Sequence, residues 1–316
     1  MILRRTAYHR VGDAPDFPLT NRRHAMAEST TTPGQVLRAA VADTAIQVPG
    51  APNALVGRLI EEMGFPAAYV SGAALSAGVL ALPDVGLITL SELVQHVAYL
   101  TSRVTIPVIV DADTGFGDTV NVERTVAELE RAGAAAIQLE DQQLPKRCGQ
   151  LSGKTLVSAE AMCAKLRAAV AARADDSTVI IARTDARGVE GLEAAIERAK
   201  QYVAAGADWI FPEALATRKE FESFAKAIDV PLVANMTEFG KSPLLDFDDL
   251  AAMGYRVVLY PATLLRVAMK AIESTLSLLA ADGSQRELLD LMQTREELYD
   301  LLDYDAYDER DREYFK

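Results

Sequence analysis

The chain has 316 residues, half of them hydrophobic, and a formal net charge of −13 at pH 7. That length fits one large domain, because barrel folds exceed the usual domain size. The negative charge argues against a nucleic-acid partner, since phosphate binding needs clustered Lys and Arg. No apolar run reaches the roughly 18 residues that a membrane-spanning helix needs. We therefore expect neither a nucleic acid nor a membrane as a partner.

The first 30 residues differ in composition from the rest of the chain. Several arginines alternate there with Pro, Asp and His, and no apolar segment follows that could form a signal peptide. We expect residues 1–30 to be a disordered arm. Organelle targeting is the weaker alternative, because Asp13 and Asp16 dilute the positive charge. A helical pattern begins near Pro33, so Met26 is a plausible second start.

One pattern recurs after the arm: a helix rich in Ala, Leu and Glu, then a glycine, then a short apolar strand. The glycines of the four repeats are Gly64, Gly133, Gly206 and Gly254. A glycine just past a helix end takes the left-handed conformation that closes the helix. The four or five apolar residues that follow are too few for a helix and suit a strand buried on both faces.

Eight strands of this kind are predicted in chain order. They begin near Ala45, Ala67, Val108, Ala135, Val179, Asp208, Pro231 and Tyr255. Helices separate them, for example over 121–132, 191–205 and 264–281, and this alternation predicts parallel strands joined by right-handed crossovers. Eight units in about 250 residues favour a (β/α)8 TIM barrel over an open sheet. We expect the barrel over 31–282 and a helical extension over 283–316.

Polar side chains mark the carboxyl end of nearly every predicted strand, where a TIM barrel carries its chemistry. They are Tyr69, Ser71, Asp111, Asp113, Glu140, Asp141, Arg183, Asp185, Glu213, Asn235, Thr237 and Tyr260. A helix cap or a loop position explains any one of these residues but does not explain all of them together. The sequence therefore predicts a site at this end of the barrel.

Two of these carboxylates, Asp111 and Asp113, are two residues apart on a predicted strand, so their side chains are expected to point the same way. Their convergence with Asp84 and Glu140 would be repulsive without a cation among them. An all-oxygen set suits Mg²⁺, or Mn²⁺, rather than Zn²⁺.

Histidine offers little acid–base chemistry, because two of the three histidines lie in the arm and His96 is predicted on a helix surface. Proton transfer therefore falls to Cys, Tyr, Glu or Asp. Cys148 is the first candidate, since it follows Lys146 and Arg147 and precedes Gly149 in a segment with little hydrophobic pattern. Neighbouring cations stabilise a thiolate, so we expect a thiol pKa lowered toward neutrality. Such a loop is typical of an active site that closes before chemistry.

A solvated basic turn with an incidental thiol is the alternative for Cys148. The second cysteine, Cys163, is expected to pack inside a helix. Two cysteines form no disulfide framework, which predicts a reducing, cytoplasmic setting.

Among the arginines, Arg183 ends a buried strand and is expected to bind a substrate carboxylate. Arg266 and Arg295 fit a helix surface as well as such a role.

Several segments together carry a family resemblance. They are VDADTGFGD, LEDQ, KRCG, IARTDA, FPEA, ANMTEFG and MQTREELYD, and the similarity runs from about Gln35 to the C-terminus. The chain resembles the 2-methylisocitrate lyases of the isocitrate lyase/phosphoenolpyruvate mutase superfamily. Isocitrate lyases proper share the cysteine loop but are longer, whereas phosphonomutases and related hydrolases share the metal site but lack that loop. The resemblance implies cleavage of a 2-hydroxy tricarboxylate, 2-methylisocitrate, to pyruvate and succinate in propionate breakdown through the methylcitrate cycle.

The resemblance also implies roles for individual residues. Mg²⁺ would be held by Asp111 and Asp113, partly through water, with Asp84 and Glu140 around it. The hydroxy-acid portion of the substrate would contact Ser71, Gly72, Ala73 and Arg183. The succinate portion would contact Gly149, Glu213, Asn235, Met236, Thr237, Arg266 and Arg295. Cys148 would protonate the succinate carbanion, and Tyr69 would handle the hydroxyl proton.

The tail after Gly283 carries leucines and a methionine at helical spacing, an apolar stripe that must pack on something. Packing on its own barrel is one possibility. The resemblance instead implies exchange of helices between the subunits of a homotetramer, which would bring Arg295 near a substrate site.

Two positions depart from the family pattern. The family's loop normally ends in histidine after its Cys-Gly pair, whereas this chain has Gln150, which hydrogen-bonds but carries no proton or charge. Gln150 either alters the tuning of Cys148 or only anchors the closed loop. At Ala73, where the family often has glycine, a methyl group is added.

The alternative functions are a lyase or decarboxylase for dimethylmalate or oxaloacetate, and a weakly active paralogue that binds dicarboxylates.

Overall fold

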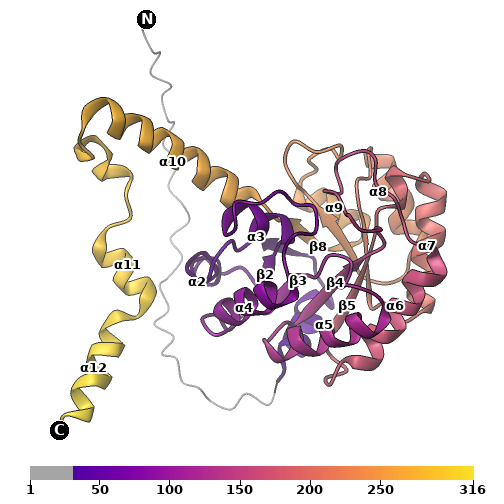
Figure 1. The fold of residues 1–316 in the computed structure, drawn as a ribbon, viewed down its shortest axis with the longest axis horizontal. Coiled ribbons are helices and arrows are strands. Elements are labelled where there is room, and N and C mark those ends of the chain that lie inside the picture. Colours follow the sequence, from indigo (N-terminus) through magenta and orange to yellow (C-terminus); the bar gives the residue numbers. More distant parts are fainter. Residues whose placement is uncertain (1–30) are drawn as a thin grey trace, which may run out of the picture.

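The computed structural model describes residues 31–316, so the disordered arm expected over 1–30 lies outside the described residues. Eight parallel strands form a single sheet (Figure 1). They are β1 (Ile46–Pro49), β2 (Ala68–Val70), β3 (Val108–Asp111), β4 (Ala136–Glu140), β5 (Val179–Thr184), β6 (Trp209–Pro212), β7 (Leu232–Asn235) and β8 (Tyr255–Tyr260).

The sheet closes on itself. The strand order is β1-β8-β7-β6-β5-β4-β3-β2, and β1 meets β2 through a parallel bridge between Gly50 and Tyr69. The backbone N–H of Ala51 donates to the carbonyl of Tyr69 at 2.8 Å across the same junction. The fold is therefore a (β/α)8 barrel, as the alternation of elements predicts.

Helices that connect consecutive strands surround the barrel, and further helices precede β1 and follow β8. The described helices are α1 (Pro33–Val41), α2 (Ala54–Glu62), α3 (Gly72–Gly78), α4 (Leu90–Thr101), α5 (Thr119–Arg131), α6 (Ala159–Ala172), α7 (Leu192–Ala204), α8 (Arg218–Ala227), α9 (Phe247–Met253), α10 (Thr263–Asp282), α11 (Arg295–Leu302) and α12 (Tyr304–Tyr314). The repeat glycines that end four of them have φ values of 81°, 92°, 106° and 105°, which confirms the left-handed caps.

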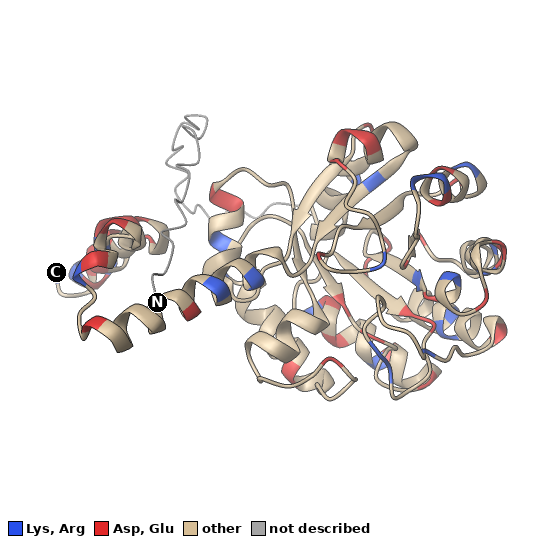
Figure 2. Cartoon of the chain, turned by 90° about the horizontal axis from the view of Figure 1, so that it is seen from above, with Lys and Arg blue, Asp and Glu red and all other residues tan. Residues whose placement is uncertain are grey.

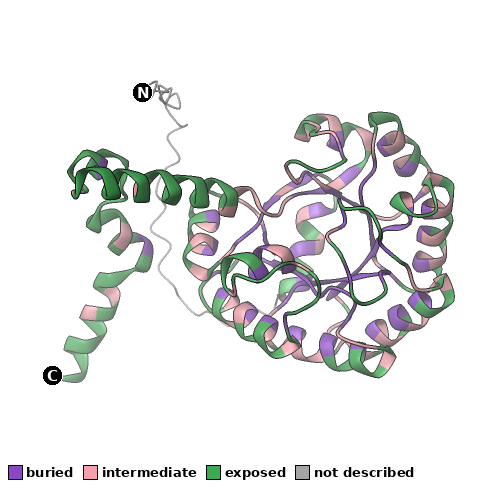
Figure 3. Cartoon of the chain, turned by 45° about the horizontal axis from the view of Figure 1, so that its top comes forward, coloured by how far each residue is buried: buried purple, intermediate pink, exposed green. Residues whose placement is uncertain are grey.

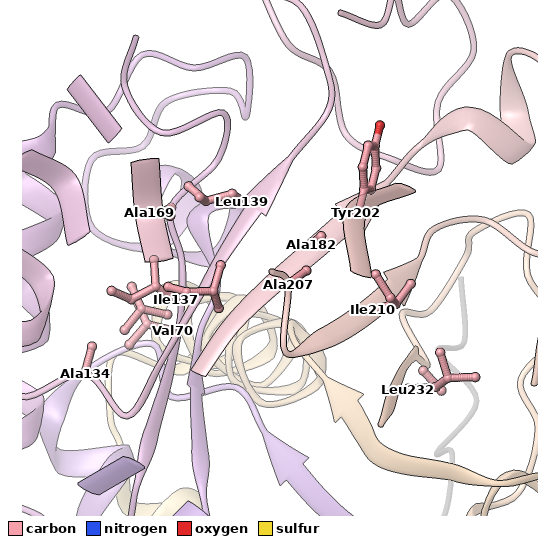
Figure 4. Close-up of a cluster of buried hydrophobic side chains, with 14 of the residues drawn as sticks. Val70, Ala134, Ile137, Leu139, Ala169, Ala182, Tyr202, Ala207, Ile210 and Leu232 are labelled. Carbon is pink, nitrogen blue, oxygen red and sulfur yellow. The ribbon is translucent and has the colours of Figure 1, made fainter. Parts of the chain in front are cut away.

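Alternation along the strands divides the core into two layers. One layer joins strands to the surrounding helices, where Ile137 and Ile210 pack near Ala169 and Tyr202 (Figure 4). The other fills the barrel interior and includes Leu37 from α1. Cys163 of α6 is buried in the outer layer, which confirms its packing role.

α1 covers the amino end of the barrel. Its Leu37 and Val41 join the interior layer, and Arg38 Nη2 lies 2.8 Å from Asp208 Oδ1, just before β6. Burying an apolar side chain of this size stabilises the fold by about 1.5–3 kcal/mol. The barrel is thus closed at its amino end, which leaves the carboxyl end for chemistry.

Side chains on each strand alternate between its two faces, and this alternation places the interior apolar residues and the polar residues of the site on the same face. On most strands, the residue two positions after an interior apolar side chain is polar and buried or half-buried. The pairs are Ile109 with Asp111, Ile181 with Arg183, Phe211 with Glu213, and Val233 with Asn235. On β4 the interior series runs from Ala136 through Gln138 to Glu140. The polar side chains at the strand ends therefore point toward the barrel axis, because they lie on the same strand face as the interior apolar residues that precede them.

The helices after β8 extend away from the barrel (Figures 1 and 3). None of the 20 residues of α10 is buried, and Val267, Ile272 and Leu276 are exposed. Tyr307 of α12 accepts a hydrogen bond at 2.7 Å from Arg103, which follows α4. Within the predicted stripe after Gly283, Leu288 and Leu301 are buried, whereas Leu289, Leu291, Met292 and Leu302 are exposed in one chain.

Lys and Arg alternate with Asp and Glu over the outer helices rather than gathering on one face (Figure 2). Within residues 31–316, no helix combines the length and the apolar character needed to cross a bilayer.

Candidate active site

Three buried carboxylates converge at the carboxyl ends of β3 and β4. Asp111, Asp113 and Glu140 each offer an oxygen, and these oxygens lie within 4.8 Å of one another. The expectation that both aspartates share one strand face is wrong, because β3 ends at Asp111. Asp113 instead has a φ of 48°, and its backbone N–H donates to Asp111 Oδ1 at 3.2 Å. A left-handed turn therefore brings the two carboxylates together.

The Asp111 carboxylate is held by two further donors. Gln138 Nε2 donates to Oδ1 at 3.1 Å, and the backbone N–H of Gly72 donates to Oδ2 at 3.2 Å. A Cβ at Gly72 would lie 3.1 Å from Asp113 Oδ1 and 3.3 Å from Asp111 Oδ2. Glycine therefore allows the first turn of α3 to approach the carboxylates.

Gln138 also connects Asp111 to Tyr69, whose hydroxyl donates to Gln138 Oε1 at 3.1 Å. Sequence reasoning missed this glutamine, although it lies two residues before Glu140 and shares its strand face. Burial, together with the nearby charge of Asp111, raises the pKa of Tyr69 well above its usual range. Tyr69 is thus a neutral phenol that donates a hydrogen bond.

The acidic cluster carries more negative charge than its surroundings stabilise. Burial raises the pKa of Glu140 well above its usual range, and burial with the repulsion of Asp111 raises the pKa of Asp113 to about 6. Glu140 Oε1 is buried and has no hydrogen-bond partner among the described residues. Three converging oxygens with one open position fit a hard divalent cation, which would stabilise the ionised forms.

Lys146 lies at the edge of this cluster. Its Nζ is 2.6 Å from Asp113 Oδ1 and also contacts Asp84. Burial opposes this charge, but Asp113 and Glu140 raise the pKa of the ammonium group above its usual range. Asp84 is half-buried and is not one of the three converging carboxylates. Asp84 is connected to the cluster by Lys146, which pairs with both Asp84 and Asp113. Residue spacing in the sequence did not predict these ion pairs.

Cys148 lies half-buried in the loop between β4 and α6. Burial raises the pKa of its thiol, and the backbone N–H of Gln150 and the charge of Arg183 offset this only in part. The prediction of a lowered thiol pKa is therefore wrong. Lys146 pairs with carboxylates instead, and the Arg147 side chain is exposed. A thiol that stays protonated near neutrality suits a proton donor better than a thiolate nucleophile.

Arg183 is buried at the end of β5 between several anions. Its Nε lies 3.0 Å from Asp185 Oδ2 and 3.4 Å from Glu140 Oε2, and its guanidinium lies 5.3 Å from the Phe211 ring centroid. Lys154 pairs with the same carboxylate, with Nζ 2.6 Å from Asp185 Oδ1. Sequence reasoning missed Lys154, because it lies in a loop without periodicity.

The Glu213 carboxylate organises the opposite wall. Oε1 accepts hydrogen bonds from Gln150 Nε2 and the backbone N–H of Ala214, while Oε2 accepts one from Asn235 Nδ2 at 3.1 Å. Arg183 Nη2 lies 3.5 Å from Oε2. Asn235 Oδ1 is buried without a hydrogen-bond partner among the described residues, so it is available to a ligand.

Gly149 brings the cysteine loop onto this wall. A Cβ at Gly149 would lie 2.2 Å from Arg183 Nη2 and 2.4 Å from Glu213 Cγ. No larger residue fits without displacing one of them. The loop therefore places Cys148 beside the Arg183–Glu213 pair.

Other predicted site residues lie around this centre. The Ser71 hydroxyl caps α3 by accepting from the backbone N–H of Ala74 at 3.3 Å, and Ala73 is half-buried in the same turn. Met236 is buried, and Thr237 after β7 is half-buried.

Three further residues named from the sequence, Arg266, Arg295 and His96, lie at different distances from the site. Arg266 lies in the first turn of α10, with Nε 3.5 Å from Glu238 Oε2, beside the turn that follows β7. Arg295 is exposed on α11, away from the barrel (Figure 1), so one chain alone does not bring it to the site. His96, expected on a surface, is half-buried, and burial lowers its pKa.

The arrangement combines a place for a divalent cation, a buried guanidinium and a protonated thiol at one end of the barrel. The phosphoenolpyruvate phosphomutase family model matches residues 37–280. The 2-methylisocitrate lyase of Aeropyrum pernix is 55% identical over 287 residues, which cover 90% of this chain and 92% of that protein.

Solved structures agree with this relationship. A 2,3-dimethylmalate lyase of the same superfamily superposes with a TM-score of 0.85 at 33% identity, covering 90% of this chain and 96% of that one. A phosphonopyruvate hydrolase in complex with oxalate and Mg²⁺ has a TM-score of 0.83 at 34% identity, with coverage of 90% and 100%. The chain therefore belongs to the isocitrate lyase/phosphoenolpyruvate mutase superfamily, in the family of the 2-methylisocitrate lyases.

Proposed function

We propose that this protein is a carbon–carbon lyase that cleaves 2-methylisocitrate to pyruvate and succinate. The observation that carries the proposal is the buried acidic triad lying at the same barrel end as the half-buried thiol of Cys148. Identity of 55% to a protein of that activity supports this substrate more strongly than the 33% identity to a dimethylmalate lyase supports that alternative. The reaction would serve propionate breakdown in the cytoplasm, the location expected from the two free cysteines.

Asp111, Asp113 and Glu140 would hold Mg²⁺, or Mn²⁺, and Asp84 would contribute by keeping Lys146 at the rim of the cluster. The open Oε1 of Glu140 supports this placement. The ion would supply Lewis acidity toward the hydroxyl and carboxylate of a 2-hydroxy acid.

The hydroxy-acid portion of the substrate would lie between the acidic triad and the first turn of α3. Ser71, Gly72 and Ala73 form that turn, and Arg183 offers a planar guanidinium to a carboxylate. Tyr69, held by Gln138, would orient the hydroxyl as a neutral phenol.

Cleavage sends the electron pair of the broken carbon–carbon bond to the carbon that becomes a methylene of succinate. Cys148 would deliver its proton to that carbon, while the substrate loses its hydroxyl proton as the pyruvate carbonyl forms. The hydroxyl proton would pass to solvent and the Cys148 thiolate would regain a proton from solvent before the next turnover, so the reaction neither consumes nor releases a proton overall. The raised thiol pKa supports this role, because the donor must be protonated at neutral pH.

The carboxylates of the succinate portion would contact Gly149, Asn235, Thr237 and Arg266, with Met236 as an apolar wall. Glu213 was expected to contact the substrate directly. Its oxygens already accept from Gln150, Ala214 and Asn235. We therefore propose that Glu213 acts by positioning Asn235 and Arg183.

The exposed apolar surface of α10 supports a homotetramer in which neighbouring subunits exchange helices. A 20-residue helix with no buried residue presents side chains such as Val267, Ile272 and Leu276, each worth about 1.5–3 kcal/mol when buried. Exchange would carry Arg295 toward a neighbour's site. The boundaries at 30/31 and 282/283 stay predictions of where the barrel domain begins and ends.

Purified protein supplied with Mg²⁺ is expected to release equimolar pyruvate and succinate from 2-methylisocitrate. Exhaustive EDTA treatment should abolish the activity, and added Mg²⁺ should restore it. The assay is a coupled measurement of pyruvate with chromatographic detection of succinate. Preference for isocitrate, dimethylmalate or oxaloacetate in the same panel would contradict the substrate assignment, and full activity in EDTA would contradict the metal assignment.

Cys148→Ser is expected to lower kcat by about a hundredfold or more, the order found when a general acid is lost. Substrate binding, measured by calorimetry, should change little. Cys163→Ser is the matched control, because that thiol packs in the outer layer of the core. Equal turnover in the two variants would remove the acid role from Cys148.

Static light scattering should report a tetramer at micromolar concentration. Replacing Val267, Ile272 and Leu276 together with Ser should shift the mass toward smaller species, because the substitutions remove the apolar contacts of α10. A monomeric wild-type protein would rule out exchange of helices.

A further inference from the structure

Gln150, which replaces the family's histidine, is buried and has every polar atom of its side chain engaged. Its Nε2 donates to Glu213 Oε1, and its Oε1 accepts from the backbone N–H groups of Lys241 at 2.7 Å and Ser242 at 3.4 Å. The backbone N–H groups of Lys241 and Ser242 settle the orientation of the amide, because they only donate and so must face its oxygen.

These hydrogen bonds join three segments that follow three different strands. Gln150 belongs to the loop after β4, Glu213 follows β6, and residues 240–242 belong to the turn after β7. A Cβ at Gly240 would lie 2.6 Å from Gln150 Oε1, so the turn approaches the amide about as closely as a backbone can. Lys241 Nζ adds a second link to the cysteine loop through Ser152 Oγ at 2.9 Å.

The position of Gln150 determines what this junction controls. Cys148 lies two residues earlier in the same loop, and Gly149 between them fits against Arg183 and Glu213. The carboxylate that accepts from Gln150 also accepts from Asn235 at 3.1 Å. Displacing the amide would therefore remove the link between the thiol-bearing segment and Glu213, and leave that segment held by the hydrogen bond from Lys154 Nζ to the Gly149 carbonyl.

We propose that Gln150 is a positioning residue whose neutral amide ties the cysteine loop to Glu213 and to the 240–242 turn, and thereby fixes Cys148 over the substrate. The proposal rests on the proposed function for its catalytic consequence. Gln150 acts through Cys148 and need not touch the substrate, because its amide nitrogen and its amide oxygen each bond within the protein. A neutral imidazole also offers one donor and one acceptor, so histidine can replace it, whereas leucine offers neither.

The test measures how fast iodoacetamide alkylates Cys148, in a Cys163→Ser background so that one thiol reacts. Gln150→Leu should raise the alkylation rate about tenfold or more and lower kcat about tenfold or more with a smaller change in KM, since small misplacements of reacting groups cost large factors in rate. Gln150→His, measured at mildly alkaline pH where the imidazole is neutral, should stay within about twofold of wild type in both quantities.

Gln143→Leu is the matched control, because Gln143 is an exposed glutamine of the same connecting segment. It should leave the alkylation rate and kcat unchanged. Gly240→Ala keeps Gln150 intact but places a methyl against its Oε1, so it should also accelerate alkylation and serves if Gln150→Leu fails to fold.

Alkylation at the wild-type rate in folded Gln150→Leu, or in Gly240→Ala, would overturn the proposal. Failure of Gln150→His to restore the wild-type rate would do the same. The alkylation readout needs no turnover, so it remains decisive if 2-methylisocitrate proves not to be the substrate. In that case accelerated alkylation would support the positioning role while the proposed function failed.

Discussion

Repulsion between buried carboxylates is the constraint on which the rest of this site depends. The period of two along the strands places Asp111 and Glu140 above an apolar interior, and a left-handed turn adds Asp113. Burial penalises their charged forms, which is why the pKa values of Asp113 and Glu140 rise. Such a cluster is stable only with cations around it. The strand ends provide the anions and the Arg183 guanidinium, and the cysteine loop provides two further cations.

Two lysines of the cysteine loop pair with carboxylates at this end of the barrel, and Lys146 does so within the cluster itself. Lys146 pairs with Asp84 and Asp113, and Lys154 pairs with Asp185. The loop therefore carries its thiol to the site while its charged side chains find partners on the barrel. Gln150, which lies between the two lysines in the sequence, adds uncharged hydrogen bonds from the loop to Glu213 and to the backbone of Lys241. Burial raises the pKa of the Cys148 thiol, and the pairing of Lys146 with carboxylates explains why this basic neighbour does not lower it.

The sequence was sufficient to predict the eight strands, their order along the chain and the polar residues at their ends, because a period of two and helix-ending glycines are local signals. It did not reveal that Asp113 reaches the cluster through a turn, or that Lys146 faces carboxylates rather than the thiol. Those outcomes depend on contacts between distant segments. Gln138 could have been found from the alternation on β4, whereas Lys154 follows no local pattern. The acidic metal set was predicted from the carboxylates at the strand ends, whereas most substrate contacts and the exchange of helices came from family resemblance, and all three stay proposals.

The most direct test of the account is an anomalous difference map from crystals grown with Mn²⁺ and pyruvate. The account predicts one strong peak in coordination contact with the carboxylates of Asp111, Asp113 and Glu140, with pyruvate bound to the same ion and Arg183 beside its carboxylate. An ion bound elsewhere, or a cluster that keeps only Lys146 as its cation at saturating Mn²⁺, would contradict it.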